Sequence, residues 1–162
     1  MSIQITAATI EDLSLLAPLF DGYRVFYEQT SDLALAHFFL EQRIRQQESI
    51  IFLATELIDV RETNTSEKIG VGFVQLYPSF SSVSAKRLWI LNDLYVAPNA
   101  RRRGLAEALM NRARDFAVQD GAKGLFLETA HDNHGAQALY ESLGYRKNTE
   151  FYYFLATPAE VK

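Results

Sequence analysis

The chain has 162 residues, of which 48% are hydrophobic and 22% charged, and this balance favours one folded domain over a disordered chain. Its net charge of −4 argues against a nucleic-acid partner, because binding to phosphates draws on a surplus of Lys and Arg. It contains no cysteine, which excludes disulfides, a thiolate nucleophile and a cysteine-ligated zinc site.

The first half of the chain predicts a strand, two helices and a strand pair. Ile3 and Ile5 alternate with polar neighbours as in a short strand, and residues 9–12 resemble a helix capping box. Apolar residues at steps of three and four then predict a helix to about residue 28, followed by a second helix that Ser31 caps. Two segments rich in β-branched and aromatic residues predict an antiparallel hairpin, over 49–57 and 68–77.

The second half predicts alternating strands and helices over 87–96, 104–119, 124–129 and 135–143, with a last strand pair ending near residue 155. The predicted order is βααβββαβαββ, a single α/β domain over residues 1–162 with a mixed sheet. A strand, helix and strand in succession predict a parallel pair with a crossover helix. The loop between strand and helix then lies at the carboxyl ends of the strands, where ligands tend to bind.

That loop is a candidate anion site. Amides at the start of a helix have no intrahelical acceptor, and a pyrophosphate can accept their hydrogen bonds and gain from the helix dipole. Gly104 and Ala106 leave room for close backbone approach, and Arg101, Arg102 and Arg103 add positive charge. A solvated basic turn is the alternative, but three arginines at a helix N-terminus are unfavourable unless an anion lies among them.

Two segments carry a resemblance to a known family. The loop has neither a Rossmann Gly-x-Gly-x-x-Gly nor a P-loop Gly-Lys-Ser/Thr. Its pattern Arg-x-x-Gly-x-Ala, over residues 101–106, resembles the acetyl-CoA signature of the GNAT N-acetyltransferase superfamily. Residues 133–145 resemble that superfamily's Asn-x-x-Ala-x-x-Leu-Tyr followed by Gly-Phe or Gly-Tyr. The residues at 91–96, together with those at 133–137, most resemble the branch containing yeast histone and polyamine acetyltransferases.

The resemblance implies a GNAT-like fold with a central, splayed pair of parallel strands. It also implies transfer of an acetyl group from acetyl-CoA to a primary amine, by direct attack in a ternary complex. The acceptor would be a small-molecule amine, a polyamine or a protein lysine. The alternative is a non-catalytic acyl-CoA-binding sensor or interaction module, because a fold does not determine function.

The resemblance further implies where acetyl-CoA binds. The pyrophosphate would rest on loop amides, the pantetheine arm would lie like a strand between the splayed strands, and an amide near Leu94 would polarise the thioester. Asn133 would contact the pantetheine or phosphate region, or serve only as a helix N-cap. The implied cofactor-binding residues are Leu94, Tyr95, Val96, Arg101, Arg102, Arg103, Gly104, Leu105, Ala106, Asn133 and Tyr140.

Two residues are implied for proton transfer. Tyr140 matches the tyrosine that protonates the departing CoA thiolate in many relatives, and a phenol with a usual pKa of about 10 suits that role. A core tyrosine is the alternative. Asp93 is the candidate general base, although some relatives have Glu-Asp where this chain has Asn92-Asp93, so a structural carboxylate is equally open. Glu128 on the next strand is the fallback base.

The acceptor, metal and partner expectations rest on fewer residues. Tyr23, Tyr27 and Glu28 combine aromatic and acidic groups where relatives bind the acceptor, so they are candidate substrate-binding residues. We expect no metal, because the two loop histidines lack a third ligand at suitable spacing. The apolar segment 151–155 offers a strand edge, so we expect a homodimer. With no signal-peptide pattern or apolar run of about 18 residues, we expect a cytoplasmic protein without a membrane partner.

Overall fold

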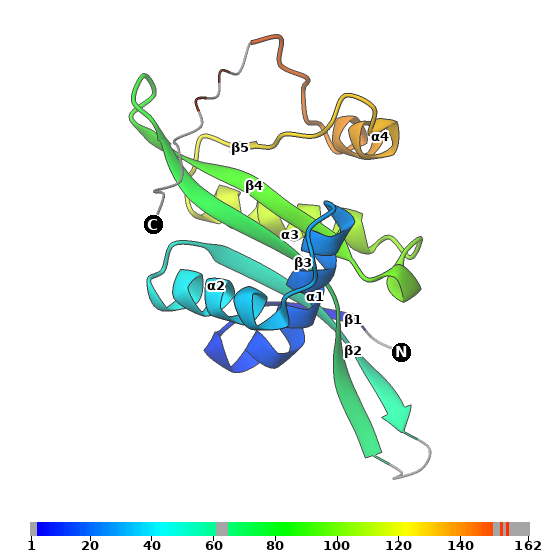
Figure 1. Ribbon diagram of the computed structural model, residues 1–162. Helices are drawn as coiled ribbons and strands as arrows, with labels where there is room; N and C mark the ends of the chain where they lie inside the picture. Colours follow the sequence, from blue (N-terminus) through cyan, green and yellow to red (C-terminus); the bar gives the residue numbers. More distant parts are fainter. Residues whose placement is uncertain (1–2, 61–64, 151–152, 154, 156–162) are drawn as a thin grey trace. The chain divides into compact units, whose positions relative to one another are not determined.

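Two compact units make up the chain in the computed structural model, which describes residues 3–60, 65–150, 153 and 155. Within these residues the first unit, Met1–Glu128, contains a five-stranded sheet with three helices, and the second, Thr129–Lys162, contains one helix (Figure 1). The strands are β1 (Ile3–Ala7), β2 (Ile50–Val60), β3 (Thr65–Ser81), β4 (Lys86–Val96) and β5 (Leu125–Phe126). The helices are α1 (Leu13–Phe26), α2 (Leu33–Arg45), α3 (Leu105–Gln119) and α4 (His134–Ser142).

The first helical segment starts at the capping box predicted over residues 9–12. The Thr9 amide and hydroxyl donate to the Asp12 carboxylate at 2.9 and 3.2 Å, and a single 3₁₀ turn then leads into α1. The apolar residues of α1 recur every three or four positions, which puts them on one face of the helix. The buried members of this face are Leu13, Leu16, Ala17, Leu19 and Phe20.

The predicted N-cap of α2 was wrong by one residue. Asp32, rather than Ser31, accepts the hydrogen bond from the Leu35 amide, at 2.9 Å. The Ser31 hydroxyl instead donates to the Asp21 carboxylate at 2.7 Å, and the Asp32 amide donates to the same group at 2.8 Å. Asp21 therefore ties the start of α2 to α1, which is a contact between two elements that local sequence rules do not predict.

The sheet has the order β1-β2-β3-β4-β5. Strands β1 to β4 pair antiparallel, which confirms the predicted hairpin as β2 and β3. This hairpin extends past the rest of the sheet (Figure 1). β4 and β5 pair parallel with α3 as the crossover helix, as predicted. β5 is shorter than the predicted strand over 124–129, because only Leu125 and Phe126 pair with β4.

Helices cover both faces of the sheet, with α1 and α2 on one face and α3 on the other (Figure 1). Side chains alternate between the faces along each strand. Ile51 and Leu53 of β2 belong to the core cluster formed with α1 and α2. The intervening Phe52 faces α3, where its ring meets Phe116 at a centroid distance of 5.6 Å. The long apolar run in β2 is thus explained by burial on both sides.

β4 is irregular at one position, and this irregularity lies where the parallel pair separates. Gln75 of β3 pairs with Asp93, whereas the next residue, Leu76, pairs with Leu91, so Asn92 is an extra residue on β4. Such a bulge bends a strand and increases its local twist. β5 pairs with β4 only before this point, at Trp89 and Ile90. The splayed parallel pair implied by the family resemblance is therefore present.

The second unit contains α4, close to the helix predicted over 135–143. Asn133 is its N-cap and accepts from the Ala136 amide at 3.3 Å. The predicted last strand pair is not found over residues 144–150, which form no strand. Residues 151, 152 and 154, on which the rest of that prediction falls, lie outside the described residues. None of the described helices is both long and apolar enough to cross a membrane.

Candidate functional site

The loop between β4 and α3 presents a run of unpaired amides. Gly104 is the N-cap of α3; it has a left-handed φ of 75° and provides no side-chain cap. Within the described part of the chain, no hydrogen bond is made by the amides of the loop and of the first turn of α3, which belong to Arg102, Arg103, Gly104, Leu105 and Ala106. A side chain at Gly104 would meet nothing within 4 Å, so glycine serves the backbone conformation here and leaves the approach open.

The three arginines of this loop differ in their partners. The Arg101 Nε donates to the Val96 carbonyl at 3.0 Å, and its guanidinium lies 5.8 Å from the centre of the Tyr95 ring. Arg102 has a φ of 61°, an uncommon conformation for a residue with a side chain. Arg103 donates two hydrogen bonds to the Glu56 carboxylate on β2, at 2.7 and 3.1 Å. The Arg103 side chain is thus engaged within the protein.

The end of β4 is held tightly against its neighbours, which positions this loop. A Cβ at Gly72 would lie 2.8 Å from the Tyr95 carbonyl oxygen, and a Cβ at Gly22 would lie 2.7 Å from the Tyr95 hydroxyl. Side chains other than hydrogen therefore do not fit at these two positions without displacement. Below the sheet, α3 is anchored by buried apolar residues, namely Leu105, Leu109, Met110, Ala113 and Ala117.

A buried polar cluster surrounds Asp93 on the face of the sheet that α1 and α2 cover. Asp93 is 3% exposed and Gln75 is 0% exposed. The Gln75 amide nitrogen donates to Asp93 Oδ2 and, at 3.1 Å, to the Tyr77 hydroxyl, while the Asn92 amide nitrogen donates to Asp93 Oδ1 at 3.0 Å. The Tyr23 hydroxyl donates to the Asn92 carbonyl oxygen at 3.5 Å and lies close enough to Asp93 to influence its pKa. We call these five residues the Asp93 cluster.

Burial controls the protonation of this cluster. Loss of solvation raises the pKa of Asp93 above its usual value, against the opposing effect of hydrogen bonds from Gln75, Tyr23 and Asn92. Burial, followed by the nearby Asp93 charge, raises the pKa of both Tyr23 and Tyr77. Both phenols are therefore neutral hydroxyls at physiological pH. A carboxyl with a raised pKa is suited to accept a proton at such a pH.

The predicted acceptor residues lie at the end of α1, and only one of them reaches the cluster. Tyr23 contacts Asp93, as described above, and its ring packs edge-on against that of Tyr27 at 5.0 Å. Tyr27 is 56% exposed. Glu28 is exposed and has a left-handed φ of 61° just after the helix, where its amide donates to the Val25 carbonyl at 3.0 Å.

The other predicted catalytic residue belongs to the second unit. Tyr140 lies on α4, and its ring centre is 6.2 Å from that of Tyr145. Asn133 begins the same helix. Asn133 can serve both as an N-cap and as a cofactor contact. The N-cap uses its side-chain oxygen, which leaves the side-chain NH₂ group able to donate to another partner.

Sequence reasoning missed three residues that the structure brings to these sites. Gln75 and Tyr77 hold or face Asp93, and Glu56 binds the Arg103 guanidinium. A weak signal existed for Gln75 and Glu56, because a glutamine within an apolar strand and a glutamate that follows an apolar run are unusual unless the polar group has a partner. The identity of that partner could not be predicted from the sequence.

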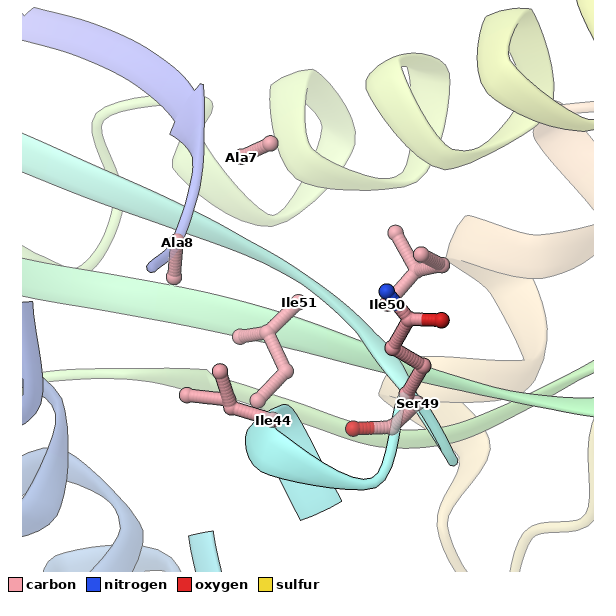
Figure 2. Close-up of a pocket in the computed structure, with 7 residues that line it drawn as sticks. Ala7, Ala8, Ile44, Ser49, Ile50 and Ile51 are labelled. Carbon is pink, nitrogen blue, oxygen red and sulfur yellow. The ribbon is translucent and has the colours of Figure 1, made fainter. Parts of the chain in front are cut away.

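A separate recess lies on the first unit and contains none of the predicted site residues. It has a volume of ≈ 330 Å³ and lies beside the end of α2 and the adjoining parts of β1 and β2 (Figure 2). Its walls are mainly apolar, and the buried Ser49 hydroxyl, which points toward Ile44, has no hydrogen-bond partner in the part of the chain that the structure describes. Among the described residues, no three side chains of metal-binding type lie together.

Comparison with known proteins places these features in one family. The Acetyltransferase (GNAT) family profile matches residues 17–145. The uncharacterized N-acetyltransferase YhfO of Bacillus subtilis (strain 168) is 45% identical over 159 residues, covering 98% of this chain and 100% of that protein. A probable acetyltransferase of Haemophilus influenzae is 31% identical, with 85% and 86% covered. A crystal structure of a probable acetyltransferase aligns with a TM-score of 0.80 at 43% identity, covering 97% of this chain and 99% of the other.

Proposed function

Because this chain belongs to the GNAT family of acetyltransferases, we propose that it transfers the acetyl group of acetyl-CoA to a primary amine within a ternary complex. GNAT-type acetyltransferase activity itself follows from the family, and acetyl-CoA is the co-substrate that the family implies. The acceptor, the residues that act on it and the order of events are the proposal. The observation that carries it is the set of amides, in the loop and the first turn of α3, that have no hydrogen-bond partner within the described residues.

The pyrophosphate of acetyl-CoA rests on these amides in the proposed complex. The amides from Arg102 to Ala106 have no partner within the described residues, and they lie at the positive end of the α3 dipole. An anion there satisfies donors that the fold leaves open, and it offsets the repulsion among the neighbouring arginines. The open space at Gly104 supports a close approach of the phosphate oxygens.

The pantetheine arm lies along β4 beyond the point where β5 separates. Within the described chain, β5 pairs only with Trp89 and Ile90, so no strand covers that side of β4 from Leu91 onward. Free peptide groups along an edge are able to pair with an extended ligand. We place the thioester near the Leu94 amide, with Tyr95 and Val96 along the arm and Asn133 near its phosphate end. A hydrogen bond to the carbonyl would stabilise the oxyanion of the tetrahedral intermediate.

Asp93 and Tyr140 move the protons in the proposed reaction. Asp93 first removes a proton from the protonated amine, directly or through a water molecule, and the neutral nitrogen then attacks the carbonyl carbon. The tetrahedral intermediate collapses with cleavage of the C–S bond, the Tyr140 hydroxyl protonates the CoA thiolate, and the Tyr140 oxygen takes up the second proton that leaves the nitrogen of the new amide. Support for Asp93 comes from its burial, which raises its pKa toward a range suitable for a base. The chain has no cysteine, so the acetyl group does not pass through a thiol of the protein.

The acceptor binds beside Tyr23, which contacts Asp93 and lies at the end of α1. Tyr27 and Glu28 follow in the chain, are both exposed, and supply an aromatic ring and a negative charge. A cation such as a protonated amine is attracted to both kinds of group. We therefore propose an amine that arrives protonated, with small-molecule amines, polyamines and protein lysine as the classes to test.

The test is release of free thiol from acetyl-CoA with a panel of such amines. Thiol release that increases with amine concentration, together with an acetylated amine product, supports the proposal. A tertiary amine of equal charge is the matched control, because it can bind but cannot form a stable amide. Binding of acetyl-CoA without amine-dependent release of thiol would contradict the proposal and favour an acyl-CoA sensor.

We also propose that residues 1–162 form one N-acetyltransferase domain and that the protein is a cytoplasmic homodimer. The family profile supports the single domain, because it spans residues from both units. The dimer rests on the apolar terminal segment, and the compartment rests on the absence of cysteine. A concentration-independent monomer mass in solution would contradict the dimer.

A further inference from the structure

The three loop arginines differ in the partners of their side chains, and this difference points to separate roles. Arg101 is held by the Val96 carbonyl, and Arg103 is held by Glu56. Arg102 makes no hydrogen bond, ion pair or ring contact within the described residues, and its backbone is left-handed. Two of the three guanidinium groups are thus committed to the protein before any ligand arrives.

Glu56 is the only partner of the Arg103 guanidinium among the described residues, and it comes from a distant part of the chain. It lies on β2, paired with Ile3 on one side and with Ile69 on the other, and is 5% exposed. Two parallel N–H···O bonds hold the guanidinium plane in a fixed orientation, which one contact would not do. The Arg103 hydrogen bonds keep the pKa of Glu56 below its usual value, so this carboxylate is ionised at neutral pH.

We propose that Glu56, acting through Arg103, is a positioning residue that holds the pyrophosphate-binding loop in its binding conformation, and that Arg102 is the loop arginine that contacts the cofactor's phosphates. This inference rests on the proposed function. Arg103 contributes one of the amides proposed to bind the pyrophosphate and immediately precedes Gly104, the N-cap of α3. Fixing its side chain to β2 therefore restricts the backbone on both sides of that glycine.

A competing account makes the opposite prediction. If Glu56 only neutralises excess positive charge, removing its charge releases Arg103 to bind phosphate, and acetyl-CoA binds as well as before or more tightly. If Glu56 positions the loop, Glu56→Gln weakens binding, because the loop must be ordered by the ligand instead. The expected rise in Kd is between about fivefold and thirtyfold, which corresponds to ordering the backbone of one further residue.

The experiment measures acetyl-CoA binding to the full chain by calorimetry, together with amine-dependent turnover. We compare three variants, namely Glu56→Gln, Arg103→Gln and the double variant. The double variant should bind acetyl-CoA no more weakly than the single variant with the higher Kd, because the pair acts as a unit. We expect turnover at saturating acetyl-CoA to be unchanged in Glu56→Gln. Glu41→Gln, which removes one partner of the Arg45 ion pair on α2, is the matched control and should bind normally.

A second arm tests Arg102. Arg102→Gln should raise the Kd and make binding less dependent on salt, whereas Arg114→Gln, which removes an equal charge from the exposed side of α3, should do neither. Equal effects of these two variants would overturn the role of Arg102. The double variant Glu56→Gln/Arg103→Gln leaves no charge unpaired, so it keeps the test valid if a single variant fails to fold.

The outcomes separate this inference from the proposed function. If the unaltered chain fails to bind acetyl-CoA, the proposed function is wrong. If the unaltered chain binds acetyl-CoA and Glu56→Gln binds it equally or more tightly, only the positioning role is wrong. A loss of turnover in Glu56→Gln without a rise in Kd would also overturn that role.

Discussion

Replacement of Asp93 by asparagine tests the proposed general base with little disturbance of the fold. The amide is nearly the same size as the carboxylate, and the cluster can adjust to it. The Gln75 side-chain oxygen is buried without a hydrogen-bond partner among the described residues, so a rotation of that amide group offers an acceptor to the new NH₂ group. We therefore expect D93N to fold normally and to lose turnover by a factor of about 10² to 10⁴, the usual contribution of a general base.

The pH dependence of the same variant gives an independent check. Burial raises the folded-state pKa of Asp93, so the folded protein holds this proton at pH values where the unfolded chain, with a pKa of about 3.9, has released it. The native chain should therefore lose stability as the pH rises from about 4 through the folded-state pKa, and D93N should not show this loss. Urea unfolding at several pH values measures the difference.

Turnover should depend on the same titration. The rate of the native chain should rise as Asp93 loses its proton, and this acid limb should be absent from the residual activity of D93N. The thiol-release assay over a pH series measures both. Glu128→Gln is the matched control, since it makes the same chemical change on the neighbouring segment. A turnover of D93N within about threefold of the native value, with the acid limb retained, would refute Asp93 as the base; loss of turnover in Glu128→Gln would identify the fallback base.

Three further substitutions test the remaining assignments. Tyr140→Phe should lower turnover with little change in acetyl-CoA affinity, because it removes only the proton donor; an unchanged rate would exclude Tyr140 as the acid. Leu109→Ala should lower the free energy of unfolding by about 2.7–5 kcal/mol in urea titration, since its side chain is fully buried; a loss below about 1 kcal/mol would contradict the packing described. Gly72→Ala should cost about 1–3 kcal/mol by thermal melting, because its Cβ would lie 2.8 Å from the Tyr95 carbonyl oxygen, and unaltered stability would contradict that contact.

The order of elements was largely predictable, because the signals that define elements are local. Three of these signals depend on residues a few positions apart: the capping box at Thr9, the apolar spacing of α1, and the β-branched and aromatic residues of the β2–β3 hairpin. The open amides of the loop before α3 were predictable for the same reason, since a helix start leaves its first amides without intrahelical acceptors whatever surrounds it. The errors arose where a competing local signal or a tertiary contact decided, as with Ser31, which contacts Asp21 instead of capping α2.

Tertiary structure decided which side chains of the candidate site hydrogen-bond one another. Nothing in the sequence distinguishes Arg102 from Arg103, because the difference depends on a carboxylate 47 residues away on β2. The environment of Asp93 likewise depends on Gln75, which the register of β3 and β4 places opposite it next to the bulge at Asn92. Sequence alone thus determined the types of group at the loop and their spacing. Which of them is buried, paired or left open depends on strand register, because register brings together residues that are distant in the chain.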